Sequence, residues 1–342
     1  MLNEKQMHEI REWLEKSQNP VFFFDNDTDG LASFLLLQRF IGRGKGVAIK
    51  SFPELTKSYL RKVQELKPDV VFILDKPLVD QEFFDGVKEY NIPIIWIDHH
   101  ELQKNTEGIH YYNPRAGKPQ SSEPVSYWCY KTVKRDLWIG MIGCLGDWFS
   151  PEFLEEFRKK YPELLDGKKK AEEILYETRF GKLIQMLNFA LRDRTSNVVR
   201  MLRVLETTNS PNEIFSEEKK YESIIKRYNQ LNRKFEKFFE KASESAKKAD
   251  KVIFFQYSGD MKLSSELSNK LMYKWPGKII IVAYVHEGKA SISLRGKKVR
   301  DYLEKALEKS GGRGGGHEEA CAANIKSEDL HKFVEEIRKQ AQ

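Results

Sequence analysis

The stretch Val21-Phe-Phe-Phe-Asp25-Asn-Asp27-Thr-Asp29-Gly30 passes from four apolar residues directly into alternating carboxylates. Such a continuous apolar run is typical of a buried strand, and the helical pattern of residues 31–41 follows it at once. Gly30 permits a sharp bend between the two elements. The stretch therefore predicts a strand that carries acidic groups at its carboxyl end and leads into a helix.

Two further strands are expected to end in the same way. Residues 70–74 precede Asp75, and residues 92–97 precede the Asp-His-His triplet at 98–100. Another apolar run and two helical patterns separate these strands, at residues 47–52, 58–66 and 81–90. The alternation predicts a parallel sheet with helices on both faces, in which the carboxyl ends of the strands meet at one edge.

The composition changes twice along the chain and predicts an α/β protein in three parts. Residues 1–150 are expected to form the parallel-sheet catalytic domain, and the charged residues 151–249 a helical connector or insert. Residues 250–342 are expected to form a smaller α/β domain. Its predicted strands are 251–257, 278–285 and 290–294, and its predicted helices are 265–273 and 299–308. Heptad-like spacing within 222–239 permits a homo-oligomer.

Charge and cysteine content bound the function. The 58 basic and 51 acidic side chains give a net charge of +7, a mild excess that favours an acidic partner such as nucleic acid. Cys129, Cys144 and Cys321 form no CxxC pair, which argues against a cysteine zinc site and fits a reducing cytoplasm. No apolar run approaches the roughly 20 residues that a membrane span needs, so no membrane partner is expected.

The clustered carboxylates predict a metal site. Asp25, Asp27 and Asp29 cannot all be buried without a compensating cation, because like charges repel and their desolvation is costly. Asp75, His99 and Asp147 add oxygen and imidazole ligands, a set that suits Mn²⁺ and, at lower affinity, Mg²⁺. Two such ions about 3.5–4 Å apart would activate water and stabilise the leaving oxygen of a phosphate ester.

Other interpretations of the acidic turn remain open. An aspartate at a strand end is often only a helix cap or turn residue. Asp25-Asn-Asp27-Thr28 is close to the Asp-x-Asp-x-Thr signature of haloacid-dehalogenase phosphatases, in which Asp25 would be the nucleophile. That alternative leaves the triplet at 98–100 without a role. A calcium loop fits less well, because no Glu stands at its twelfth position.

Taken in order, the motifs resemble the DHH phosphoesterase superfamily, most closely its RecJ-type branch with a DHH-associated C-terminal domain. The resemblance covers residues 20–150 and 250–326, and it extends more narrowly to the archaeal Hef-associated type. The motifs that carry it are Asp25-x-Asp27-x-Asp29-Gly30, Asp75, Asp98-His99-His100, Gly146-Asp147 and Gly314-Gly-Gly-His317.

The resemblance implies a site for two manganese ions. Its ligands would be Asp27 for the first ion, Asp29, His99 and Asp147 for the second, and Asp75 between both. Asp25 would support the first ion or the water, Asp98 would orient a neighbouring group, and His100 would face the scissile phosphate. Many superfamily members have a histidine four residues before Asp27, where this chain has Phe23.

The resemblance also implies a substrate site in the C-terminal domain. The residues in the matching segments that would grip a nucleotide end are Ser293, Arg295, Gly314, Gly315, Gly316 and His317. Arg313, just before the glycines, is expected to add a contact to phosphate oxygens. Glycines let backbone amides approach a phosphate, and the guanidinium of one arginine can donate two hydrogen bonds to phosphate oxygens. Asn113 and Arg115 either hold a substrate phosphate or form a turn.

We therefore expect a manganese-dependent exonuclease that releases nucleotides from an end of single-stranded DNA or RNA. The Hef-associated resemblance favours 3′ to 5′ cleavage, whereas similarity to bacterial RecJ suggests the reverse direction. The Hef-associated resemblance also implies a repair helicase or nuclease as partner. One alternative keeps the site but takes short oligonucleotides, cyclic dinucleotides or a nucleoside bisphosphate. Another is a non-catalytic replication or repair scaffold.

Overall fold

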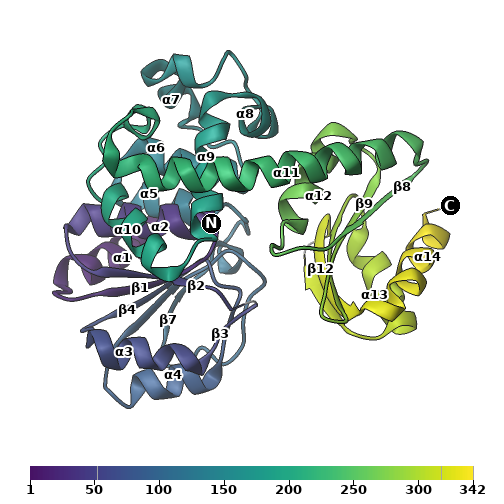
Figure 1. Cartoon of the computed structure of the whole chain (residues 1–342). Helices are drawn as coiled ribbons and strands as arrows, with labels where there is room; N and C mark the ends of the chain where they lie inside the picture. Colours follow the sequence, from purple (N-terminus) through teal and green to yellow (C-terminus); the bar gives the residue numbers. More distant parts are fainter. Residues whose placement is uncertain (52, 317, 342) are drawn as a thin grey trace. The chain divides into compact units, whose positions relative to one another are not determined.

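The computed structural model describes residues 1–51, 53–316 and 318–341. The chain folds into two compact units, Met1–Tyr228 and Asn229–Gln342, each with its own sheet and core. The long helix α11 (Glu222–Lys248) contains the boundary between them (Figure 1). The three-part division at residues 150 and 249 stays a prediction.

The first unit is built on the predicted parallel sheet, with strand order β2-β1-β4-β6-β7 and every neighbouring pair parallel. Its strands are β1 (Val21–Asp25), β2 (Lys45–Ile49), β4 (Val71–Leu74), β6 (Ile94–Ile97) and β7 (His110–Tyr112). A small parallel pair, β3 (Glu54–Leu55) and β5 (Leu78–Val79), lies outside it. The α/β expectation for this part of the chain is confirmed.

The two faces of this sheet explain why its strands are apolar throughout. Figure 1 shows α1 (Glu4–Lys16), α2 (Thr28–Ile41) and α5 (Val125–Val133) on one side, and α3 (Leu60–Leu66) and α4 (Gln81–Lys88) on the other. Successive side chains of a strand point to opposite faces. Phe24 accordingly stacks on Phe34 of α2, while Phe23 packs edge-on against Phe83 of α4. Both faces of β1 are therefore buried.

Helices make up the rest of the first unit, as expected from its composition. They are α6 (Leu137–Gly146), α7 (Leu154–Lys160), α8 (Ala171–Glu177), α9 (Arg179–Leu191) and α10 (Thr195–Leu205). Short 3₁₀ turns connect elements at Lys57–Tyr59, Pro114–Ala116, Pro162–Leu164, Pro211–Phe215, Lys219–Tyr221 and, in the second unit, Ser327–Asp329. Within the described ranges, no helix has both the length and the apolar character to cross a membrane.

The second unit contains a mixed sheet with strand order β11-β12-β10-β9-β8. Its strands are β8 (Val252–Tyr257), β9 (Ile279–His286), β10 (Lys289–Arg295), β11 (Arg313–Gly316) and β12 (Ala320–Lys326). Its helices are α12 (Ser264–Lys274), α13 (Val299–Ser310) and α14 (Leu330–Gln340). The core between the sheet and the helices α13 and α14 includes Ile281, Ile292, Leu303 and Phe333.

The glycine-rich segment forms the edge strand β11, and all four of its residues are exposed. It pairs antiparallel with β12, so that Gly314 lies opposite Ala323 and Gly316 opposite Cys321. A Cβ atom on Gly314 would lie 2.7 Å from the Ala322 carbonyl oxygen. Glycine at this position therefore permits a close approach of the two strands.

Candidate metal centre

The sheet register brings three acidic strand ends to one edge. Phe24 of β1 pairs with Leu74 of β4, which pairs with Ile97 of β6. Asp25 is the last residue of β1, and Asp75 and Asp98 directly follow β4 and β6. The three aspartates consequently leave adjacent parallel strands side by side, as the sequence predicts.

Helices add further carboxylates at this edge. Asp29 lies in the first turn of α2 and is fully buried. Its two oxygens accept hydrogen bonds from the first backbone amides of α5, at 2.8 Å from Val125 N and 2.9 Å from Ser126 N. A carboxylate is favourable at such a helix N-terminus. Asp27 caps its own helix by accepting from Gly30 N at 2.9 Å, and Asp147 caps the C-terminus of α6.

Gly30 has a different role from the one its position suggests. It lies within α2 rather than at a bend, because the helix already begins at Thr28. A Cβ atom on Gly30 would lie 2.4 Å from the backbone oxygen of Asp25. The glycine thus allows the first turn of α2 to pack directly on the end of β1, and this contact sets Asp27 and Asp29 beside Asp25.

His99 presents a lone pair to two carboxylates. Its Nδ1 lies 3.2 Å from the Ser122 carbonyl oxygen and must carry the proton to donate there, which leaves Nε2 unprotonated. That Nε2 lies 3.3 Å from Asp75 Oδ1 and 3.5 Å from Asp147 Oδ2. Burial, followed by the nearby His100, lowers the pKa of His99 and keeps the ring neutral.

These contacts test whether a cation fits. Asp75 is 2% exposed, and among the described residues no donor forms a hydrogen bond to its Oδ1. Two lone pairs that face each other at 3.3 Å repel unless a positive charge lies between them. The structure groups the donors as Asp75, His99 and His100, and as Asp29, His99 and Asp147. Both sets combine carboxylate oxygen with imidazole nitrogen, which suits Mn²⁺.

The electrostatics of the cluster agree with this fit. Burial, followed by the charges of Asp25 and Asp29, raises the pKa of Asp27 to about 7. Burial and then Asp29 raise the pKa of Asp75 well above its usual range, and the same causes act on Asp147, although 29% of its side chain is exposed. A divalent cation would relieve this repulsion and hold the carboxylates in their charged form.

Asp98 orients His100. The fully buried carboxylate accepts hydrogen bonds from His100 Nδ1 at 2.8 Å and from His100 N at 3.0 Å. Burial lowers the pKa of His100, but the hydrogen bond and charge of Asp98 outweigh it, so the net pKa is raised. Asp98 therefore favours the protonated ring.

Asn113 and Arg115 support the loop that carries the two histidines. Asn113 is 2% exposed and donates from Nδ2 to Asp98 Oδ2 at 3.2 Å and to the His100 carbonyl at 3.0 Å. Arg115 donates from Nε to the His99 carbonyl at 2.8 Å. Both side chains hold the loop in place, while their contact with a substrate phosphate stays a prediction.

One residue of the cluster, Lys76, has no counterpart in the sequence analysis. Its side chain is completely buried, and its ammonium donates to Asp25 Oδ1 and to the Ser51 carbonyl, both at 2.8 Å. A lysine that directly follows a strand-ending aspartate at the carboxyl edge of a parallel sheet is the signal that could have identified it.

In the second unit, the register places four of the predicted substrate residues on one face of the sheet, namely Ser293, Arg295, Arg313 and Gly315. Ser293 of β10 lies opposite Ala322, which lies opposite Gly315 of β11. Ser293 is buried with its Oγ 3.1 Å from Ser264 Oγ, whereas Arg313 and the three glycines after it are exposed. Arg295 ends β10 and donates from Nη1 to the Cys321 carbonyl at 3.3 Å. His317 lies outside the described residues.

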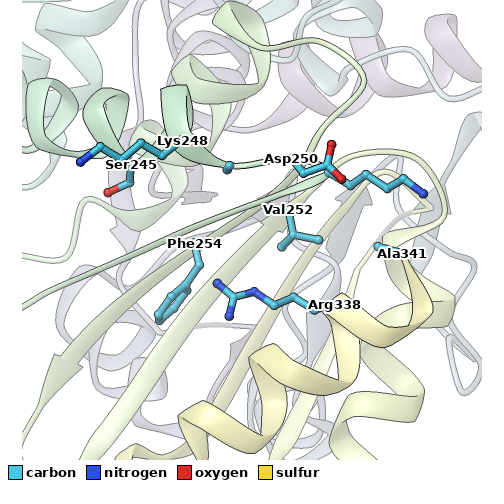
Figure 2. Close-up of a pocket in the computed structure, with 9 residues that line it drawn as sticks. Ser245, Lys248, Asp250, Val252, Phe254, Arg338 and Ala341 are labelled. Carbon is cyan, nitrogen blue, oxygen red and sulfur yellow. The ribbon is translucent and has the colours of Figure 1, made fainter.

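A separate hollow of about 470 Å³ lies on the other face of this sheet, where Val252 and Phe254 pack towards α14 (Figure 2). Its lining residues are Ser245, Lys248, Ala249, Asp250, Lys251, Val252, Phe254, Arg338 and Ala341. None of the predicted substrate residues that the structure describes lines it.

Comparisons with known proteins agree with this architecture. Residues 249–342 match the DHHA1 domain family. RecJ from Thermus thermophilus in complex with Mn²⁺ superposes with a TM-score of 0.68 at 14% identity, covering 98% of this chain but only 54% of that one. Exonuclease RecJ bound to manganese gives 0.65 at 15% identity, with 98% and 93% covered. No curated protein sequence matches significantly.

A third structure, the DHH domain of a member of a family of ribosomal proteins, gives a TM-score of 0.70 at 15% identity, covering 98% of this chain and 89% of that one. The fold is thus that of RecJ and of this DHH domain. The expected resemblance is confirmed: the chain has the RecJ-like DHH fold and ends in a DHHA1 domain.

Proposed function

We propose that this protein is a metal-dependent phosphodiesterase that uses two Mn²⁺ ions, or Mg²⁺, to release nucleotides from an end of single-stranded DNA or RNA. The observation that carries the proposal is the convergence of two carboxylate oxygens on His99 Nε2. Asp75 Oδ1 lies 3.3 Å from this nitrogen and Asp147 Oδ2 lies 3.5 Å from it. Such a set of lone pairs is arranged to hold a cation.

The side chains of the centre have separate tasks in this proposal. When bound, the ions would activate water and neutralise the charge of the phosphate. Asp29, Asp75, His99 and Asp147 hold the cations, with Asp27 on the first ion. Asp98 favours the protonated form of His100, which donates a hydrogen bond to a phosphate oxygen. Asn113 and Arg115 keep the loop of the two histidines in place.

The distribution of charge supports a nucleic-acid substrate. Residues 1–228 contain 35 basic and 35 acidic side chains, whereas residues 229–342 contain 23 basic and 16 acidic ones. The whole excess of +7 therefore belongs to the second unit. This unit also carries Arg295, Arg313 and the exposed glycines, as a unit that holds a phosphate chain would.

The proposal is tested with oligonucleotides labelled at either end, in DNA and RNA and with lengths from two to about twenty nucleotides. We expect Mn²⁺-dependent release of nucleotides that is abolished in Asp75→Asn and His99→Ala. Asp85→Asn, on the exposed side of α4, is the control and should remain active. Activity that persists in both site variants would contradict the metal centre.

The same panel decides the finer points. Loss of the 3′ label first would support the proposed 3′ to 5′ direction. Turnover confined to dinucleotides would favour the short-oligonucleotide alternative, and the absence of Mn²⁺ binding would favour the scaffold. The cytoplasmic location, the homo-oligomer and the repair helicase or nuclease partner stay predictions.

A further inference from the structure

Lys76 is the only buried lysine or arginine in the described part of the chain, and it lies at the proposed metal centre. Burying an ammonium is costly unless hydrogen bonds and an opposite charge compensate it. Asp25 supplies the charge, and the Ser51 carbonyl supplies a second acceptor. The position of this cation is therefore a specific feature of the site.

The fold fixes where the ammonium lies. Asp75 has a left-handed backbone conformation with φ 57°, which turns the chain as it leaves β4. The Lys76 carbonyl then accepts a hydrogen bond from Trp96 Nε1 at 3.0 Å. Trp96 is itself buried on the neighbouring strand β6. The hydrogen bond from Trp96 on β6 holds the backbone of Lys76 in place. The Lys76 ammonium consequently stays beside Asp25 at the end of β1.

The Lys76 ammonium compensates only one of the aspartates at the centre. Asp25 is paired with Lys76, and neither group of converging donor atoms includes Asp25 or Asp27. Phe23, on the same strand, is buried against Phe83 and offers no ligand atom. By contrast, Asp29, Asp75 and Asp147 form no ion pair with a lysine or arginine within the described ranges.

We infer that Lys76 makes the two ion positions unequal, because its ammonium takes the place of a metal ion as the counter-charge of Asp25. The ion at Asp29, His99 and Asp147 binds tightly. The ion at Asp27 must compete with the ammonium for Asp25 and is repelled by it, so it binds weakly. This inference rests on the proposed metal centre and adds an order of binding to it.

The test is a calorimetric titration of the full-length protein with Mn²⁺. The wild-type protein should bind one ion tightly and a second weakly. Lys76→Met removes the charge but keeps the apolar stem, and it should tighten the weak step by about tenfold or more while the tight step stays nearly unchanged. Electron paramagnetic resonance should show coupled Mn²⁺ pairs at a lower molar ratio of Mn²⁺ to protein in the variant than in the wild type.

Two variants guard against a merely structural effect. Lys57→Met, which removes an exposed lysine, should leave both steps unchanged. Asp25→Asn should weaken the second step further, and Lys76→Met should tighten it less in that background than in the wild type, because only the direct repulsion between the ammonium and the ion is then removed. Circular dichroism checks that each variant folds, and Lys76→Gln replaces Lys76→Met if the latter does not.

Equal affinities in the wild type, or a weak step that Lys76→Met and Lys76→Gln leave unchanged, would overturn the inference. A wild-type protein that binds no Mn²⁺ would instead contradict the proposed function itself. The two failures are therefore distinguishable in a single titration series.

Discussion

At the scale of single residues, the centre depends on His99, which belongs to both groups of donor atoms. The ring has this role because the Ser122 carbonyl fixes the tautomer, so that Nε2 faces Asp75 and Asp147. No spacing in the sequence connects Ser122 to His99. A backbone carbonyl can act in this way whatever side chain its residue carries, so only the folded chain identifies it.

The raised pKa values of Asp27, Asp75 and Asp147 predict a pH dependence. Between the ordinary carboxyl pKa and about 7, the metal-free folded protein holds more protons than the unfolded chain, so its stability falls as pH rises through this range. Mn²⁺ must displace those protons. We therefore expect Mn²⁺ affinity to increase from about pH 5 to about pH 8, with proton release.

Calorimetry in two buffers of different ionisation enthalpy measures that proton release directly. Asp27→Asn should reduce the number of protons released below about pH 7, because it removes one of the groups that titrate there. An affinity that does not change with pH would contradict the predicted coupling of protons and metal.

At the scale of elements, helix termini position the chemistry. Asp29 holds the N-terminus of α5 against α2. Arg39, also on α2, forms a two-pronged ion pair with Asp136, which precedes α6, at 3.0 and 2.8 Å. Its Nη1 donates to the carbonyls of Leu205 and Glu206 at the end of α10, both at 2.9 Å. One helix thus connects the metal centre with three others.

Arg39→Ala should therefore destabilise the first unit strongly. The variant leaves Asp136 without its partner at a site where the Arg39 side chain is only 10% exposed, and we expect a loss of about 3–5 kcal/mol in the free energy of unfolding. Urea denaturation measures the loss. Lys57→Ala, which breaks the exposed pair with Glu82, should change the stability little. Similar losses in the two variants would contradict this account.

At the scale of the whole molecule, the two units differ in charge. The first is neutral in sum, and the second carries the entire excess of +7. A single-stranded nucleic acid bound along the second unit would release counterions from its phosphates. Binding of a single-stranded oligonucleotide should therefore weaken steeply as salt concentration increases.

Arg313 is the residue at which to measure this effect, because it is exposed on β11. If it contacts one phosphate, Arg313→Gln should reduce the slope of log affinity against log salt concentration by about 0.7. Fluorescence anisotropy with a labelled oligonucleotide gives the slope. Lys159→Gln, on an exposed position of α7 in the neutral unit, is the matched control and should leave the slope unchanged. Equal slopes for all three proteins would exclude a phosphate contact at Arg313.

The parallel sheet and the edge at which its acids gather follow from the amino-acid sequence alone. Continuous apolar runs such as residues 21–24 can only be buried on both faces, and parallel strands bring Asp25, Asp75 and Asp98 to one edge. These consequences are local or follow from strand direction. They require no knowledge of which distant residues meet.

How the charges of that edge are compensated depends instead on contacts made in the folded chain. Lys76 reaches Asp25 from the end of the neighbouring strand β4, and the Val125 and Ser126 amides reach Asp29 from a helix almost a hundred residues later. Ion pairs and backbone hydrogen bonds of this kind depend on three-dimensional placement and leave no periodic signal in the chain. The place of the acids was therefore predictable, whereas the pairing of Lys76 with Asp25 is seen only in the folded chain.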